Sequence, residues 1–496
     1  MLIFGIRLLP RVLRKDKTDS DTWYHISSVM SIYKNKYKLP ECNDGFILGG
    51  KYDYPYFSHW IVSIFMRDKI IKYERFIGPT IDTLYILLGF IYLNFLLSFY
   101  EVDMANQLIN FLLLMGFSST MLKISTGPRV YSFTPRVFGE LFIFIFLISI
   151  HLYMLTDNLF FLFLSMVFGG LALNTSTFGS QVLVLFSIIL SILLHSFIPM
   201  FMFLGSLIFA WISSGGHYKN ILLQQLQFTK QYATYGQYNH PALIHRNKAF
   251  QYVLFFKYLL QLKIKDAYIV FQRDLIFFNV FYKNFEVIIV IILLPWLNIF
   301  DSFLYYMCIV AFVVFLITSF RPFLFLGESD RYLEYIIIFA TIYLVFNLEQ
   351  HYIYLILFVQ IVLYVTTLYT YLKSSNTYGA HYLNAMKFIK KNLENKDDYV
   401  IHGIFNTYIN YSIGVLSGLK SLAIEPNYVY GLATNKKLMP NDTIYTNDFD
   451  YLYTEYGVNI IIANKKYLHQ ELLYDFSKFN LFYENEQFIV YKRKQS

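Results

Sequence analysis

Polar residues near the N-terminus are the first in the chain whose types and spacing could do chemistry. The segment Asp16-Lys-Thr-Asp19-Ser-Asp21-Thr-Trp-Tyr-His25 precedes apolar residues that recur at helical spacing. A helix that begins near Asp21 would carry Asp21 and His25 on one face, because residues four apart are neighbours on a helix. Asp21 could then act as a general base or, with Asp19, hold a divalent cation. Asp21 or Ser20 could instead cap the helix, and the sequence leaves both roles open.

An aromatic segment follows and ends at a histidine. The run Lys51-Tyr-Asp53-Tyr54-Pro55-Tyr-Phe-Ser-His59 has a proline among aromatic residues, which predicts an extended corner before an apolar stretch. The side chains of Tyr54 and His59 could contact a sugar, whose ring can stack on an aromatic face. The alternative is a place in the aromatic belt at the membrane–water interface.

Two short loops contribute arginines at the ends of apolar segments. The first contains Arg129 and Arg136, and the second contains Arg321 and Arg331 together with Glu328. Four arginines on one membrane face could clamp a phosphate or diphosphate, because a guanidinium group binds phosphate through two hydrogen bonds. The alternative is flanking charge that anchors helix ends.

Three titratable residues and one cysteine lie within apolar segments. An acid at membrane depth is costly, so Glu140 indicates a functional site. We interpret His151 and His195 as polar contacts in the bundle interior rather than ligands. Cys42 and Cys308 show no metal-ligand spacing, and Cys308 lies inside an expected span, which argues against a disulfide between them.

The elements that position these residues are membrane-spanning helices. The chain has 496 residues, of which 56% are hydrophobic and 20% aromatic, above the composition of soluble proteins. The apolar residues gather in blocks that are long enough to cross a bilayer as helices. We expect an α-helical polytopic bundle of about ten or more spans, and we identify ten: 80–100, 105–122, 137–155, 158–174, 181–197, 199–213, 285–300, 301–320, 333–348 and 352–371.

The order of the spans predicts a site on one membrane face. An even number of spans separates the long polar segments from one another, so these segments and the C-terminal tail all face the same side. The basic residues of these segments predict, under the positive-inside rule, that the segments face the cytoplasm. Basic residues that bind a phosphate substrate would give the same bias. The net charge of +8 therefore indicates lipid headgroups or a phosphate-bearing substrate rather than nucleic acid.

Three domains are expected. Residues 1–79 form an N-terminal interfacial helix and an acidic loop with an amphipathic helix, and residues 1–13 do not form a cleavable signal peptide. Residues 80–372 form the bundle, with a long basic loop at 214–284. Residues 373–496 alternate helices with predicted strands, at 399–402, 421–424, 443–445, 459–463, 481–483 and 487–491. This alternation is typical of a small, mainly parallel α/β sheet.

The chain resembles the GT-C superfamily of integral membrane glycosyltransferases that use lipid-linked sugars. The resemblance rests on four features: the acidic first loop that contains Asp19 and Asp21, the Tyr54-Pro55 segment before a span, the many-helix bundle, and the α/β tail with its strand Asn459-Ile-Ile-Ile. The chain departs from the family in lacking a clear span before the acidic loop.

The resemblance implies a donor sugar on a polyprenyl phosphate or diphosphate, and a glycan, lipid or protein acceptor. The catalytic or metal-binding role falls on Asp21, with Asp19 as the alternate, and the arginines and His25 would contact the donor phosphate. The cofactor would be none, or a divalent cation (Mg or Mn). The active face would be extracytoplasmic in a bacterial or archaeal plasma membrane, and we weight this family topology above the charge rule.

Other functions remain open. A lipid-linked glycan polymerase would use the same substrate class but would transfer a whole oligosaccharide. A flippase or exporter of lipid-linked glycans is disfavoured, because transporters tend to have internal repeats and broken helices, and the sequence has no repeat. The clustered polar loops argue mildly against a non-enzymatic scaffold.

Overall fold

A computed structural model describes residues 1–14, 20–43, 45–48, 52–102, 105–122, 133–236, 238, 245–297, 301–373, 379–404, 410–424, 448–468 and 475–494. The chain divides into two compact units. We call Met1–Leu13, Arg75–Val130 and Pro135–Ser374 the helical unit, and Arg14–Glu74, Tyr131–Thr134 and Ser375–Ser496 the α/β unit.

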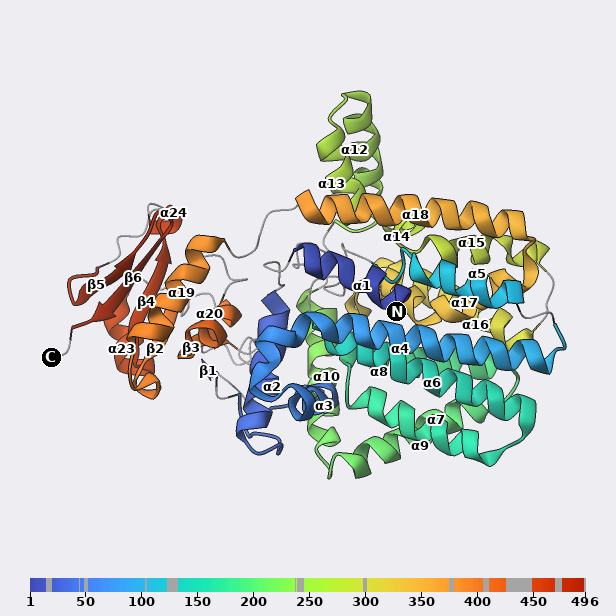
Figure 1. The fold of residues 1–496 in the computed structure, drawn as a ribbon, viewed down its shortest axis with the longest axis horizontal. Helices are drawn as coiled ribbons and strands as arrows, with labels where there is room; N and C mark the ends of the chain where they lie inside the picture. Colours follow the sequence, from blue (N-terminus) through green and yellow to red (C-terminus); the bar gives the residue numbers. More distant parts are fainter. Residues whose placement is uncertain are drawn as a thin grey trace. The chain divides into compact units, whose positions relative to one another are not determined.

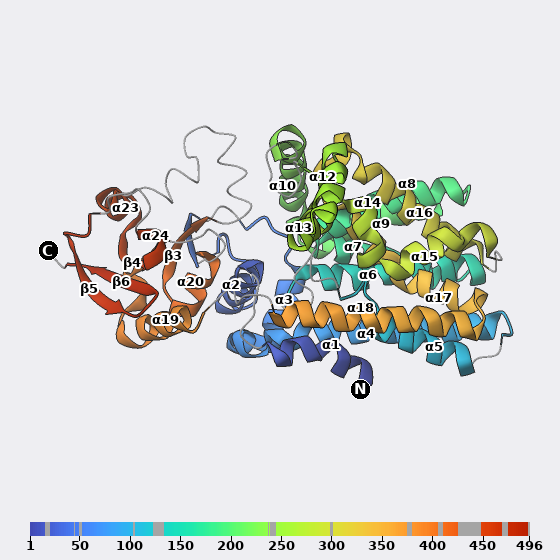
Figure 2. The ribbon, with the colours of Figure 1, turned by 90° about the horizontal axis from the view of Figure 1, so that it is seen from above.

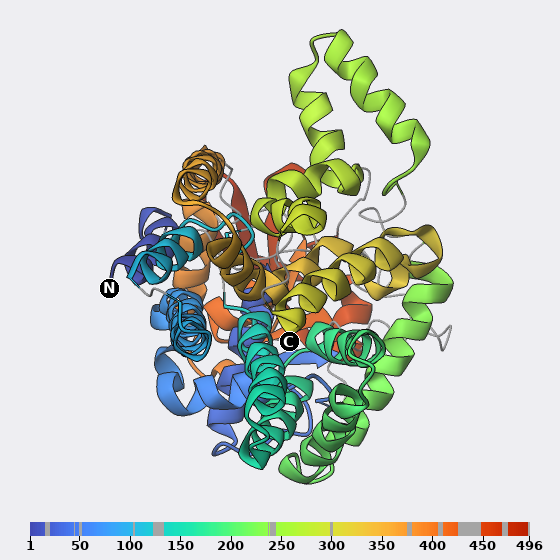
Figure 3. The same cartoon turned by 90° about the vertical axis from the view of Figure 1, so that its right-hand side faces the viewer.

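The helical unit contains the apolar segments, and its helices run beside one another as a bundle (Figure 1). Its helices, including α4 that begins in the other unit, are α1 (Leu2–Leu13), α4 (Ile70–Phe99), α5 (Ala105–Gly116), α6 (Pro135–Thr156), α7 (Leu159–Leu173), α8 (Thr177–Leu193), α9 (Ile198–Ser213), α10 (Tyr218–Gln231), η3 (Tyr232–Gly236), α12 (Ala249–Leu260), α13 (Ile264–Asp274), α14 (Ile276–Lys283), α15 (Phe285–Leu293), η4 (Leu294–Trp296), α16 (Ser302–Ser319), η5 (Arg321–Leu326), η6 (Ser329–Ile336), α17 (Ile337–Asn347) and α18 (Gln350–Lys373). Helices α12 and α13 form a hairpin that stands out from the rest of this unit (Figure 3).

All ten apolar segments coincide with helices, but they differ in length. Among the described residues, four helical stretches are long and apolar enough to span a membrane: Phe57–Phe99, Pro135–Thr156, Ser302–Ser319 and Gln350–Lys373. A fifth is counted if α14 and α15–η4 form one span, although they meet at an angle of 105°. The other apolar helices, such as α7 and α9, fall short of the roughly 20 residues that cross a bilayer.

Short turns join the helices at points where the chain takes a left-handed conformation. The φ angles are +56° at Glu101, +51° at Asp157 and +48° at His195. After α8 the N–H of Ser196 donates to the carbonyl of Ser191 at 3.1 Å, as in the common left-handed helix ending. The expectation that His195 is an interior contact is therefore wrong, because His195 lies exposed in this turn.

His151 is an interior polar contact, as expected. Its Nε2 lies 3.0 Å from Oδ2 of Asp301, and its Nδ1 lies 2.5 Å from the hydroxyl of Tyr92. The hydroxyl of Tyr100 donates to the same carboxylate oxygen at 2.6 Å, and the N–H of Leu304 donates to Oδ1 at 2.8 Å. This network joins α4, α6 and the start of α16.

The α/β unit is built around one six-stranded sheet of order β1-β3-β2-β4-β6-β5. Neighbours from β1 to β4 pair in parallel, β6 pairs antiparallel with β4, and β5 pairs antiparallel with β6. Helix α19 lies on one face of the sheet and α23 on the other (Figure 2). The strands are β1 (Phe46–Leu48), β2 (Val400–Ile404), β3 (Lys420–Ile424), β4 (Val458–Asn464), β5 (Phe479–Glu484) and β6 (Phe488–Arg493). The helices are α2 (Ser20–Lys34), α3 (Phe57–Met66), η1 (Arg67–Lys69), α19 (Ala380–Asn392), η7 (Lys396–Asp398), α20 (Asn410–Ser417), α23 (Phe449–Tyr456) and α24 (Lys465–Leu468).

The sequence predicts most of this sheet but not its first strand. Strands β2 to β6 occupy the predicted strand segments, and the small, mainly parallel sheet is confirmed. The predicted strand at 443–445 lies outside the described residues. Strand β1 comes from the N-terminal segment and pairs with β3, with Phe46 opposite Ser421.

A buried carboxylate ties three parts of the helical unit together. Glu286, in the first turn of α15, is 1% exposed. Its carboxylate accepts hydrogen bonds from the backbone N–H of Ser119 at 2.6 Å, the hydroxyl of Thr120 at 2.6 Å and the amide of Gln360 at 2.7 Å. These bonds replace the water that the charge loses on burial, so they hold the bend at α14–α15 against α18 and residues 119–120.

We expect Thr120→Val to destabilise the helical unit, because the buried carboxylate loses one of its donors. A hydrogen bond to a charged group contributes about 1.5–3 kcal/mol, so thermal unfolding in detergent should occur at a clearly lower temperature. Thr156→Val is the control, since its hydroxyl bonds the carbonyl of Leu152 in an exposed turn. Equal unfolding temperatures for the two variants would contradict the role given to Glu286.

Candidate functional site

A cluster of histidine and aromatic side chains lies in the α/β unit where α2 meets the start of α3. We call it the histidine–tyrosine cluster: Tyr24, His25, Tyr52, Tyr54, His59, Phe133 and Tyr411. The His25 and His59 rings are 5.1 Å apart between centroids, and the Tyr54 ring lies 5.7 Å from His25 and 5.6 Å from His59. Tyr24 contacts Tyr54 and Tyr411 in edge-on geometry. The structure thus brings together three predicted site residues, His25, Tyr54 and His59.

A hydrogen-bonded chain runs through this cluster. The hydroxyl of Tyr52 lies 3.0 Å from Nδ1 of His59, and Nε2 of His59 lies 3.0 Å from Nδ1 of His25. A neutral imidazole carries one proton, so if Tyr52 donates to His59, His59 must donate to His25. The opposite direction is also allowed, and in either case the tautomers of the two rings are coupled. The chain can therefore pass a proton between His25 and Tyr52.

Asp21 is one helical turn before His25 and lies exposed in the first turn of α2. A carboxylate is favoured there by the helix dipole, so its position fits both a structural and a chemical role. Asp19 lies outside the described residues. Among the residues that the structure describes, no group of three or more His, Cys, Asp or Glu side chains could hold a metal ion. We therefore derive no step through a metal.

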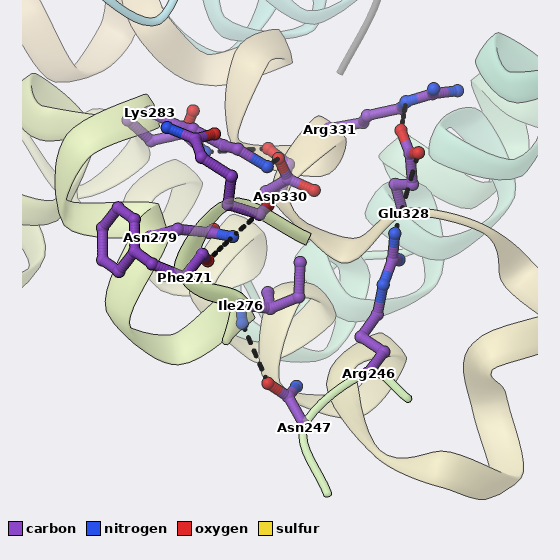
Figure 4. Close-up of polar contacts among 11 residues, drawn as sticks. Arg246, Asn247, Phe271, Ile276, Asn279, Lys283, Glu328, Asp330 and Arg331 are labelled. Carbon is purple, nitrogen blue, oxygen red and sulfur yellow. Dashed lines mark hydrogen bonds and ion pairs between the residues drawn. The ribbon is translucent and has the colours of Figure 1, made fainter. Parts of the chain in front are cut away.

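The second predicted group lies in the helical unit, where two arginines meet at Glu328 (Figure 4). We call Arg246, Lys283, Glu328, Asp330 and Arg331 the basic cluster. Nη2 of Arg246 lies 3.7 Å from Oε1 of Glu328, and Nε of Arg331 contacts Oε2 of the same carboxylate. Nζ of Lys283 lies 3.5 Å from Oδ2 of Asp330, with both side chains buried. The cluster thus holds three cations against two carboxylates.

Local contacts fix the segments that carry the basic cluster. Oδ1 of Asn247 accepts the N–H of Ile276 at 3.0 Å, which attaches the residue after Arg246 to the start of α14. The amide of Asn284 donates to the carbonyl of Asp330 at 2.8 Å at the bend between α14 and α15. The Arg331 guanidinium lies 6.0 Å from the Phe178 ring centroid.

Arg246 has hydrogen-bonding capacity that the described part of the chain leaves unused. Its side chain is 4% exposed, and its Nε and Nη1 atoms make no hydrogen bond to any described residue. A buried guanidinium with donors of this kind is costly. An anionic ligand would satisfy them.

The remaining predicted residues of the helical unit take separate positions. Arg136 lies in the first turn of α6, and Glu140 lies buried one turn later. Helix α6 packs against η6, which carries Arg331. Arg321 is exposed and lies 5.9 Å from the Tyr238 ring centroid. Arg129 lies outside the described residues.

Sequence reasoning did not single out several members of the two clusters, among them Arg246, Lys283 and Tyr52. Arg246 and Lys283 lie in the long basic loop 214–284, where the excess of cations was visible but gave no reason to choose these two. Tyr52 stands in the quoted aromatic run, yet only the structure shows its bond to His59.

The fold is similar to that of solved archaeal oligosaccharyltransferases. The crystal structure of the Archaeoglobus fulgidus oligosaccharyltransferase with Zn and sulfate matches with a TM-score of 0.57 at 10% identity, over 99% of this chain and 73% of that chain. Its apo form matches with a TM-score of 0.57 at 9% identity, over 93% and 69% of the two chains. The form tethered to an acceptor peptide with the NVT sequon matches with a TM-score of 0.54 at 10% identity, over 93% and 68%.

No protein-family model matches the sequence, and no curated protein matches it. At these identities the likeness to solved structures shows the fold. The expected combination of a helical bundle with a C-terminal α/β domain is therefore confirmed, and membership of the GT-C superfamily stays a prediction.

We expect Tyr52→Phe to disturb the tautomers of His25 and His59, because His59 loses the hydroxyl that fixes the direction of the chain. Nitrogen-15 NMR of histidine-labelled protein in nanodiscs should show altered imidazole signals for these two residues. Tyr33→Phe, also in the α/β unit but outside the cluster, should leave the signals unchanged. An unaltered spectrum for Tyr52→Phe would rule out the coupled chain.

Proposed function

We propose that this protein is a membrane glycosyltransferase that moves a sugar from a polyprenyl-phosphate or polyprenyl-diphosphate carrier to a glycan, lipid or protein acceptor. The observation that carries the proposal is the convergence of Arg246 and Arg331 on Glu328 within an oligosaccharyltransferase-like fold. Guanidinium groups are suited to phosphate. Glu328 balances their charge while no phosphate is bound, so the cations are already gathered when the donor arrives.

The proposed reaction is a direct displacement at the anomeric carbon of the donor. The acceptor atom forms a bond to that carbon while its proton passes to the carboxylate of Asp21. The bond between the carbon and the phosphate oxygen breaks, and the phosphate leaves with the electron pair. Cations from the basic cluster stabilise the negative charge that develops on the phosphate.

Other predicted residues receive supporting roles. His25, Tyr54 and His59 would contact the substrate through the histidine–tyrosine cluster, a role supported by their shared position. Arg136 and Arg321, and Arg129 if it joins them, would add to phosphate binding. Asp19 is the alternate base, and with Asp21 it would hold a divalent cation if the reaction needs one. The solved relative with Zn supports testing metals.

The membrane arrangement is also part of the proposal. We propose about ten spans, with the shorter apolar helices counted among them, and an extracytoplasmic active face in a bacterial or archaeal plasma membrane. The four to five helices of spanning length support insertion in a membrane. The solved relative tethered to an acceptor peptide makes a peptide the first acceptor to test.

The first test of this function is sugar transfer by the purified protein in nanodiscs, offered a panel of polyprenyl-phosphate and polyprenyl-diphosphate sugars with and without EDTA. We expect release of the lipid phosphate, abolished in Asp21→Asn because the base is lost. Asp68→Asn, an exposed acid of η1 in the same unit, is the control and should keep its activity. Full activity of a folded Asp21→Asn variant would remove Asp21 from the reaction.

A second test addresses the basic cluster. We expect Arg331→Lys to raise the KM for the donor by about tenfold, which corresponds to about 1.4 kcal/mol, because lysine cannot bind phosphate through two parallel hydrogen bonds. Arg67→Lys, at an exposed arginine of η1, should leave the KM unchanged. If Arg331→Lys also leaves it unchanged, the phosphate lies elsewhere.

A further inference from the structure

The α/β unit contains a polar cavity that has no part in the proposed transfer reaction. We call it the tail pocket; its volume is about 640 Å³. Its wall includes Tyr399 just before β2, Asn459 in β4 and Lys492 in β6. The pocket therefore lies at the end of the sheet where the parallel strands β2 and β4 begin. Strands β2, β4 and β6 are labelled in Figure 1.

Positive charge dominates the wall of the tail pocket. Four basic side chains line it, Lys478, Lys492, Arg493 and Lys494, against one acid, Asp398. Outside the lining, Asp450 pairs with Lys478 and, at 2.9 Å, with Arg493. Hydrogen bonds from these two cations hold the pKa of the Asp450 carboxyl below its usual value. Even with Asp450 counted, the cations outnumber the acids by four to two.

Neighbouring groups hold the cations in place. Nζ of Lys492 donates to the hydroxyl of Tyr399 at 2.9 Å, and Nζ of Lys494 donates to the carbonyl of Ser477 at 2.7 Å. The Arg493 guanidinium lies 3.9 Å from the ring centroid of Tyr453. Ordered cations lose less conformational entropy when a ligand binds, so the wall is prepared for an anion.

Two further features limit the chemical class of ligand that the tail pocket can bind. Nη1 of Arg493 is shielded from solvent and makes no hydrogen bond to any described residue, so an acceptor on a ligand would satisfy it. None of the described residues that line the pocket is aliphatic, so an acyl chain would find only two tyrosine rings and the stems of the basic side chains to pack against. The volume falls in the range of roughly 300–1,000 Å³ that is typical of small-ligand sites.

We propose that the tail pocket binds an acidic saccharide, one whose sugar rings carry carboxylate or phosphate groups. Lysine and arginine recognise the acid groups through charge-assisted hydrogen bonds. The hydroxyls of Ser477, Tyr399 and Tyr453 add the polar character that suits sugar hydroxyls. The proposal does not depend on the transfer reaction, because none of these residues belongs to the histidine–tyrosine cluster or the basic cluster.

The test is calorimetric binding of tetragalacturonate to the full-length protein in phosphatidylcholine nanodiscs. We expect saturable binding that weakens as salt is raised, because the contacts are ionic. The neutral galactose tetramer should not bind, and inorganic phosphate should compete. Equal binding of the neutral tetramer, or no competition by phosphate, would overturn the proposal.

Variants of the lining residues test whether the saccharide binds in the tail pocket. The double variant Lys492→Gln with Lys494→Gln should bind at least about tenfold more weakly, since it loses two charge-assisted contacts. The matched control, Lys390→Gln with Lys466→Gln, removes two exposed lysines of the same unit that do not line the pocket. An equal loss in both double variants would overturn the proposal. If the first fails to fold, Lys494→Gln alone replaces it. A further titration uses separate, empty nanodiscs that contain phosphatidylglycerol. If the protein binds these and does not bind tetragalacturonate, the proposal is overturned and the pocket is assigned to a membrane surface.

Discussion

The arrangement of the helical unit depends on the cost of placing charge in an apolar interior. A carboxylate moved out of water must regain its lost hydrogen bonds or be paired with a cation. Glu286 meets this requirement with donors from residues 119–120 and α18, and Asp301 meets it with Tyr100, His151 and the start of α16. Each acid joins segments that are far apart in the sequence, so the donors that each buried carboxylate needs hold those segments together.

The same constraint shapes the basic cluster. Arg246, Glu328 and Arg331 are gathered because two guanidinium groups and one carboxylate reduce one another's burial cost. The pairing is incomplete at Arg246, whose Nε and Nη1 have no partner in the described part of the chain. A structural ion pair would be expected to use all its donors. The unused donors are the physical reason for the proposal that this part of the bundle binds an anion.

The sequence predicts those parts of the fold that depend on local pattern. Apolar blocks gave the ten predicted segments of the bundle, and alternating short segments gave β2 to β6. The expectation of a long loop at 214–284 is wrong, because helices α10, α12, α13 and α14 lie there. Contacts between residues far apart in the chain could not be predicted from local sequence pattern. The sequence of Phe46–Leu48 is an apolar run too short to predict a strand, and it does not indicate the partner β3. His195 was misplaced because the left-handed helix ending, which usually takes glycine, is occupied here by histidine. The bend at Asn284 and the position of Arg246 depend on tertiary hydrogen bonds and pairs that no spacing reveals.

Strand β1 has a consequence for the order in which the chain can fold. Its partner β3 is synthesised near the other end of the chain, so the apolar helices emerge from the ribosome before β1 can pair. Contacts of such long sequence separation form late, because the chain between them must first be ordered. The N-terminal segment that carries Asp21 and most of the histidine–tyrosine cluster therefore reaches its final packing only after the C-terminal tail has been synthesised. A nascent chain that has not been elongated past β3 would thus hold its N-terminal segment without the strand against which β1 pairs.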